Sequence, residues 1–276
     1  VVCLEKNYFR IISSAAVRTH DKAHILRHLS KDIEFKDITD DLICLGIFGP
    51  KSRELLSKIT NENLSNENFK FGTAKYIKIG SLNIWAQRLS YVGELGYELY
   101  ISNKNAKEIY DLIVETGKSF NLTHCGAHTM DTMRMESGFL HWAHDVSPEE
   151  NQYQAGLNFA ISYKKPFDFI GKQKLLEIKN QKIDRRFVML TLKDSTPGKP
   201  LLLHEEPIYL DDKIIGKTTS GNYSFNYNKN LSFGYINSEL TNEQLIDKNL
   251  FIEIEKIKYK AQLLLKPLKQ GNFKKI

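Results

Sequence analysis

The sequence lacks the features that would place a protein in or across a membrane. Its 276 residues contain no run of about 18 apolar residues, and the mean hydropathy is -0.39. The first residues also lack the basic-then-apolar order of a secretory signal. We therefore expect no membrane partner and a cytoplasmic location.

Cysteine is scarce. The chain has three cysteines, Cys3, Cys44 and Cys125, which are widely spaced and form no CxxC pair. An odd number without close spacing excludes a disulfide framework and a cysteine-based zinc site. We interpret the three as buried thiols of a protein from a reducing compartment.

The basic charge is not concentrated. The formal net charge is +6, but the lysines are scattered and no basic run is interleaved with aromatic residues. Only the stretch from Lys266 to Lys275 is locally basic, which is typical of a solvated tail. We therefore expect no nucleic-acid partner, whereas a modest positive field favours anionic ligands.

The first two thirds of the chain mixes strand and helix patterns. Asp21 can cap a helix that runs through Leu29, and the helical pattern at Ala127–Ser137 ends at Gly138. Strand-like runs of β-branched and apolar residues lie at Val1–Leu4, Tyr8–Ser13, Ile43–Phe48, Tyr76–Ile79, Asn83–Ser90 and Tyr97–Ser102. Interleaved elements of this kind indicate α+β or α/β, and we predict the α+β class.

The last third contains strand patterns only. After a short helix within Gly171–Lys182, the expected strands are Arg186–Lys193, Pro207–Leu210, Lys213–Thr219, Leu231–Ile236, Leu250–Ile257 and Tyr259–Leu265. Asp211-Asp212 and Ser220-Gly221-Asn222 have turn composition. We predict a boundary near Asp184, with one domain at residues 1–183 and a small C-terminal β-barrel at residues 184–276.

The stretch RLSYVGELGYELY, from Arg88 to Tyr100, is the first candidate site. Gly93 and Gly96 permit a positive φ or a close approach to the backbone. Glu98 lies just past this loop and Tyr91 lies on its other side, so a flat heterocycle with adjacent N–H donors could bind the carboxylate while packing on the ring. The alternative is an ordinary hairpin with an exposed Glu98.

The stretch CGAHTMDTMRMESGFLHWAHD, from Cys125 to Asp145, is the second. Asp131 and Arg134 are spaced to pair along a helix; Arg134 and Glu136 could instead anchor neighbouring loops, which is the interpretation we favour. The spacing of His141, His144 and Asp145 allows a metal site, but a well-spaced third ligand is missing and we predict no metal. Trp142 is the better ligand-contact candidate, because its ring offers stacking area and an N–H donor.

Four ordered motifs carry a family resemblance. SYVGELGYELY, RMESGFLHWAHD, the Gln154-Ala155-Gly156-Leu157 stretch and DFIGKQKL resemble, in that order, the T-protein of the glycine cleavage system. The resemblance implies a three-lobed aminomethyltransferase fold around a cavity for tetrahydrofolate. It also implies that Glu98 holds the pterin ring, that Tyr91 lines the pocket, and that Trp142 is a further contact.

Two departures refine this resemblance. T-proteins usually have arginine where this chain has Met130, and HWAHD resembles the HWGHD of dimethylglycine and sarcosine dehydrogenases. The implied role is a module that captures an iminium derived from a methylated amine on tetrahydrofolate, with FAD in an N-terminal domain of the parent chain. The sequence begins with Val1, and the family's catalytic aspartate lies upstream of the strand matching Val1–Leu4, so the catalytic residue is unknown and we expect an N-terminally truncated domain.

Two other functions stay open. One is a stand-alone aminomethyltransferase, or a demethylase of sulfur compounds, on the same fold. The other is a non-catalytic folate-binding module. Such modules carry a KGCYxGQE-type loop, and the matching SYVGELGYE stretch has no cysteine.

Overall fold

A computed structural model describes residues 1–271 and 273–275 of the chain. The chain forms two compact units. The first unit comprises Val1–Ser90, Glu94–Thr123 and the C-terminal residues from Phe273, and the second comprises Tyr91–Gly93 and the chain from His124 up to that C-terminal segment. No helix among the described residues is both long and apolar enough to cross a membrane.

An antiparallel sheet organises the first unit. Its strands lie in the order β3 (Leu42–Phe48), β6 (Gly96–Ser102), β5 (Leu82–Gln87) and β4 (Ala74–Ile79). All three pairings are antiparallel. An antiparallel sheet with helices on its face is the α+β arrangement, so the predicted fold class is confirmed.

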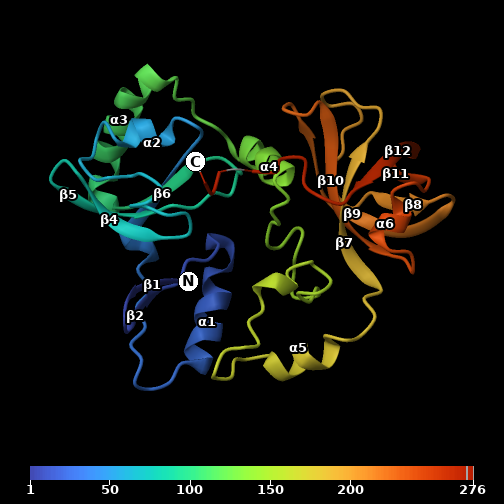
Figure 1. Cartoon of the computed structure of the whole chain (residues 1–276), viewed down its shortest axis with the longest axis horizontal. Helices are drawn as coiled ribbons and strands as arrows, with labels where there is room; N and C mark the ends of the chain where they lie inside the picture. Colours follow the sequence, from blue (N-terminus) through green and yellow to red (C-terminus); the bar gives the residue numbers. More distant parts are fainter. Residues whose placement is uncertain (272, 276) are drawn as a thin grey trace. The chain divides into compact units, whose positions relative to one another are not determined.

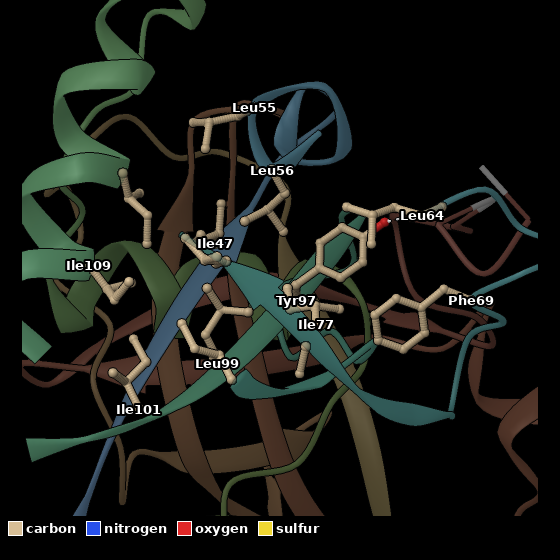
Figure 2. Packing of buried hydrophobic residues seen from close by; sticks show 14 of the residues in the cluster. Ile47, Leu55, Leu56, Leu64, Phe69, Ile77, Tyr97, Leu99, Ile101 and Ile109 are labelled. Atoms are coloured by element: carbon tan, nitrogen blue, oxygen red, sulfur yellow. Dashed lines mark hydrogen bonds between the residues drawn. The ribbon is translucent and has the colours of Figure 1, made fainter. Parts of the chain in front are cut away.

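One face of this sheet forms the core of the first unit. Successive side chains of a strand point to opposite faces, so Tyr97, Leu99 and Ile101 of β6 lie on the same face, and all three are buried. They pack with α2 (Ser52–Leu56) and α3 (Ala106–Gly117), whose buried residues include Leu56 and Ile109. Figure 2 shows these side chains gathered against one another. The alternate residues of β6, including Glu98, therefore face the other way.

The N-terminal elements belong to the first unit. A hairpin of β1 (Val2–Glu5) and β2 (Tyr8–Arg10) precedes α1 (Arg18–His28). In Figure 1 these elements lie on the side of the sheet opposite α2 and α3. Asp21 lies in the first turn of α1 and does not cap it. That prediction was wrong because a 3-10 turn at Ala15–Val17 leads directly into the helix and starts it earlier.

The second unit begins with helical segments. The helices before its barrel are α4 (Ala127–Glu136) and α5 (Lys172–Ile178), and Gly138, with φ +74°, follows the end of α4 as predicted. Among the described residues, further short 3-10 turns lie at Thr39–Asp41, Asn103–Asn105 and Lys118–Phe120 in the first unit and at Asn158–Ala160 in the second.

A closed barrel follows, drawn in yellow-orange to red in Figure 1. Within the described residues its strand order is β10-β7-β12-β11-β8-β9. The bounds are β7 (Arg185–Leu192), β8 (Pro207–Leu210), β9 (Lys213–Ser224), β10 (Lys229–Asn237), β11 (Leu250–Ile254) and β12 (Ile257–Leu264). The helix α6 (Asn242–Leu245) is one short turn with a capping box from Thr241. The predicted C-terminal β-barrel is thus confirmed.

Two predictions, one of a turn and one of buried cysteines, are wrong. Ser220-Gly221-Asn222 is not a turn, because β9 runs through it and pairs with β10 along its length. The three cysteines are exposed rather than buried. In contrast, Asp211, with φ +53°, does lie in the predicted turn between β8 and β9.

The barrel starts at Arg185, whereas the division into compact units falls at Thr123. The domain boundary at residues 183 and 184 therefore stays a prediction.

Candidate functional site

The loop between β5 and β6 depends on its two glycines. Gly93 has φ +66°, and a Cβ there would lie 2.0 Å from the Oγ of Ser137. At Gly96 a Cβ would lie 2.2 Å from the ring of Phe48. The first glycine is required by a positive φ and both by close packing, as the sequence predicted.

Glu98 lies on the sheet face opposite the core. It is half-buried and accepts a hydrogen bond from the hydroxyl of Tyr100 at 2.7 Å. Its cross-strand neighbours are Gln87 on β5 and Gly46 on β3. Burial and the bond to Glu98 raise the pKa of Tyr100 well above its usual range, so the phenol stays a donor to the carboxylate. The exposed Glu98 of an ordinary hairpin is therefore not what the structure shows.

The groups around Glu98 are aromatic and rich in donors. Phe48 and Gly46 lie on the same face of β3. The ring of Phe48 lies against Gly46, the cross-strand partner of Glu98, and against Gly96, two residues before Glu98. Trp85 pairs with Tyr100 and lies under the guanidinium of Arg10, whose Cζ is 5.4 Å from the ring centroid.

Several of these donors have no acceptor within the protein. Among the described residues, the buried Nε and Nη1 of Arg10, Nε1 of Trp85 and Nε2 of Gln87 make no hydrogen bond. A buried unpaired donor costs free energy, and a ligand with acceptor atoms would remove that cost. None of these residues was predicted from the sequence, because Trp85, Gln87 and Phe48 reach the face of Glu98 through strand register, and Arg10 reaches Trp85 from a separate hairpin.

Cys44 lies on the same face, opposite Tyr100. Although the residue as a whole is exposed, loss of solvent around its sulfur raises the pKa of Cys44 to about 11, and the charge of Glu98 contributes. Only the thiolate reacts with alkylating agents.

We expect iodoacetamide at pH 8 to alkylate Cys44 roughly tenfold more slowly than an ordinary exposed thiol, because the small thiolate fraction outweighs the higher nucleophilicity of a thiolate with a raised pKa. Cys3 and Cys125 are internal references, and peptide mass spectrometry reports all three rates. Glu98→Gln should accelerate Cys44 alone. An equal rate at the three cysteines would contradict the assigned environment.

Tyr91 and Trp142 both belong to the second unit. The hydroxyl of Tyr91 donates to the carbonyl of Leu140 at 2.9 Å, and its ring stacks on Phe139 with centroids 6.2 Å apart. Burial raises the pKa of Tyr91. Trp142 lies in the same loop region and exposes 46% of its surface. The structure thus brings Tyr91 to the loop that carries Trp142.

A buried network holds this loop. Arg134 pairs with Asp131 at 2.7 Å, forms an ion pair with Asp145, and donates to the carbonyl of Phe139 at 3.0 Å and to Ser220 at 2.8 Å. Asp145 also accepts from the backbone N–H of His141 at 2.9 Å. The predicted pairing and anchoring role of Arg134 is confirmed.

Glu136 anchors a second segment. It is fully buried and accepts from the hydroxyl of Ser224 at 2.6 Å and from the amide of Asn226 at 2.9 Å. This carboxylate therefore joins α4 to the end of β9, as expected of a structural residue.

His141 and His144 stack with ring centroids 4.5 Å apart. Desolvation, with smaller contributions from His144 and Arg134, lowers the pKa of His141. In the part of the chain that the structure describes, no group of three or more His, Cys, Asp and Glu side chains could hold a metal ion.

Glu98 belongs to the first unit and Tyr91 and Trp142 to the second. A cavity shared by all three stays a prediction.

Family models match nearly the whole chain. The model of the GCVT N-terminal domain matches residues 1–165, and that of the glycine cleavage T-protein C-terminal barrel domain matches residues 185–269.

Two of the curated relatives show what the chain is similar to. The chain is 35% identical over 265 residues to human mitochondrial dimethylglycine dehydrogenase, covering 94% of this chain and 30% of that enzyme. It is 30% identical over 275 residues to an aminomethyltransferase of Alkaliphilus metalliredigens, covering 98% of this chain and 72% of that protein. The chain therefore spans about a third of the length of the dehydrogenase and most of the length of the aminomethyltransferase.

The fold also matches a solved structure. Superposition on the glycine cleavage system aminomethyltransferase T of Bartonella henselae gives a TM-score of 0.77 with 17% identity, covering 93% of this chain and 67% of the other. At this identity the match bears on the fold alone.

Proposed function

Because the chain belongs to the glycine cleavage T-protein family, we propose that it binds tetrahydrofolate and takes part in one-carbon transfer to it. The observation that carries the proposal is Glu98, a half-buried carboxylate on the sheet face opposite the core, fixed by Tyr100 at 2.7 Å. The pterin edge presents two adjacent N–H donors, which a carboxylate can accept in parallel.

The residues around Glu98 fit such a ring. Phe48 offers an aromatic surface beside the carboxylate, and Trp85 and Gln87 offer buried donors without protein acceptors. A ligand with both N–H donors and acceptor atoms matches this mixture. Bound tetrahydrofolate supplies the ring nitrogen that takes up the one-carbon unit.

The chain's own residues bind and orient the folate and exclude water around it. In the proposal Tyr91 and Trp142 are further folate contacts. No catalytic residue is assigned among the described residues.

The finer proposal is a module of an enzyme like dimethylglycine or sarcosine dehydrogenase. The HWAHD motif and the identity to dimethylglycine dehydrogenase support it. The one-carbon donor would be an iminium from a methylated amine, and FAD would belong to a further domain of the parent chain. A cytoplasmic location stays a prediction.

A second candidate is a stand-alone aminomethyltransferase, which the match over 72% of the Alkaliphilus protein favours. A non-catalytic folate-binding module is disfavoured, because the SYVGELGYE loop has no cysteine. Assay of the parent protein separates the two enzymes: a dehydrogenase reduces its flavin with a methylated glycine, whereas an aminomethyltransferase needs an aminomethyl group on lipoate.

Replacing Glu98 with glutamine should weaken tetrahydrofolate binding about ten- to a hundredfold. Glutamine keeps the shape but sets an amide N–H against one pterin donor, and loss of a charge-assisted hydrogen bond costs about 1.5 to 3 kcal/mol. Titration calorimetry under anaerobic conditions measures both affinities, after circular dichroism has shown that both proteins are folded.

The matched control is Glu108→Gln, an exposed change on α3 against the opposite face of the sheet. It should leave the affinity unchanged. Saturating folate should also slow alkylation of Cys44 but not of Cys3. Equal affinities for the wild type and Glu98→Gln would remove Glu98 from the site.

A further inference from the structure

Gln87 is an unusual residue for the middle of a protein. It exposes only 2% of its surface, and its Nε2 makes no hydrogen bond among the described residues. A buried amide donor of this kind normally has an acceptor. Nothing in the packing of β5 requires an amide here, because the core lies on the other face of the sheet, where Ile84 and Ala86 point.

The register places this amide beside the carboxylate. Gln87 and Glu98 are direct cross-strand partners on β5 and β6, so their side chains share a face with Cβ atoms about 5 Å apart. Glu98 offers acceptors, of which one oxygen also receives the Tyr100 hydroxyl, and Gln87 offers a donor. Together they form a row of acceptor and donor groups along one edge.

The edge of a pterin presents the complementary row. Its 2-amino group and N3–H are adjacent donors, and the 4-oxo oxygen next to them is an acceptor. If Glu98 accepts from the two N–H groups, the oxygen falls on one side of the carboxylate. On β3 the facing residue is Gly46, which has no side chain, so Gln87 is the cross-strand partner able to donate.

We propose that the Nε2 of Gln87 donates to the 4-oxo oxygen of the pterin and so determines which heterocycles bind beside Glu98. The inference rests on the proposed function, and it names a specificity-determining residue of that site. A carboxylate alone would also accept rings that carry an amino group in place of the oxygen. With Gln87 in place, the oxo form gains a bond that an amino group cannot accept.

The test variant is Gln87→Leu, with Gln87→Met as a second variant that keeps an unbranched chain. We expect either to weaken tetrahydrofolate about tenfold in calorimetry, a change typical of one lost buried hydrogen bond. Tetrahydropterin, which lacks the benzoylglutamate tail, should lose affinity by the same factor, because the bond is to the ring. Gln87→Glu should weaken both ligands further, since it sets a second carboxylate against the oxygen.

The melting temperature distinguishes a role of Gln87 in binding from a purely structural role. The ligand-free chain keeps an unpaired amide at Gln87, so Gln87→Leu should melt at an equal or higher temperature than the wild type while binding more weakly. A residue that mattered only for folding would show a lower melting temperature. The control is Asn83→Leu, an exposed position with the same parity on β5, which should leave affinity unchanged.

The outcomes separate the two proposals. If wild-type protein binds tetrahydrofolate, Glu98→Gln weakens it and both Gln87→Leu and Gln87→Met bind like the wild type, the role of Gln87 is wrong and the folate site stands. A loss for tetrahydrofolate without a loss for tetrahydropterin would also overturn it, since Gln87 would then contact the tail. If the wild type does not bind tetrahydrofolate, the proposed function fails and this inference fails with it.

Discussion

Replacing Asp145 with alanine is expected to lower the free energy of unfolding of the second unit by about 3 to 5 kcal/mol. Asp145 is buried and pairs with Arg134, which is 1% exposed. The substitution would leave the guanidinium buried with only Asp131 as a charged partner, and Thr219 and Ser220 would lose an acceptor at 2.6 and 2.8 Å. Removing one partner of a buried ion pair costs far more than the pair contributes.

Denaturant unfolding followed by tryptophan fluorescence measures this effect. The chain has two tryptophans, Trp85 in the first unit and Trp142 in the second, so a Trp85→Phe background leaves the second as reporter. Asp168→Ala, which removes an exposed ion pair with Lys172, is the control and should cost less than about 1 kcal/mol.

A compensating variant sharpens the result. The double change Arg134→Met with Asp145→Leu should recover much of the lost stability, because it removes both fully buried charges, and the Asp131 carboxylate that loses its partner is 32% exposed. If Asp145→Ala unfolds at the same denaturant concentration as Asp168→Ala, the network does not stabilise the loop that carries Trp142.

Replacing Leu99 with alanine is expected to destabilise the first unit by about 2 to 5 kcal/mol. Leu99 is fully buried on the core face of β6, in the cluster drawn in Figure 2. Its removal leaves a cavity lined by the rest of that cluster. A Trp142→Phe background leaves Trp85 as the reporter of this unit.

The matched control is Ile43→Ala on β3, where the side chain is 41% exposed and less apolar surface leaves contact. It should cost less than half as much, since the loss scales with buried area. Under conditions where Leu99→Ala is folded, its tetrahydrofolate affinity should stay within about threefold of the wild type. A large loss of affinity with little loss of stability would mean that the two faces of β6 do not have separate roles.

Much of the architecture follows from local patterns in the sequence. The run of apolar and β-branched residues at Tyr97–Ser102 predicted β6, the turn composition at Asp211-Asp212 predicted the turn between β8 and β9, and the stop at Gly138 predicted the end of α4. These features depend on the backbone preferences of a few adjacent residues, so they can be predicted without knowledge of the rest of the fold. The family motifs added the order of the domains and the candidate residues.

Local composition gave a wrong prediction where a residue packs against a segment that is distant in the sequence. Gly221 was predicted to form a turn, but it lies within β9, where a Cβ would be 2.6 Å from Leu202 and its neighbour Ser220 hydrogen-bonds Asp145. The glycine therefore permits close packing of another segment, which no short window of sequence records. The exposure of the cysteines could not be predicted from the sequence either, because other segments of the chain determine the packing around each one.

The sequence by itself determined that Glu98 follows a glycine-bearing loop and stands on a strand. Only the tertiary structure decided which groups stand beside it: Gln87, Phe48 and Gly46 come from other parts of the chain through strand register. Register is fixed by burial of one whole face of the sheet, so a slip of one residue would exchange the core with the site. The chemistry of Glu98 could be anticipated from its residue type, but the unpaired donors around it are a property of the assembled sheet.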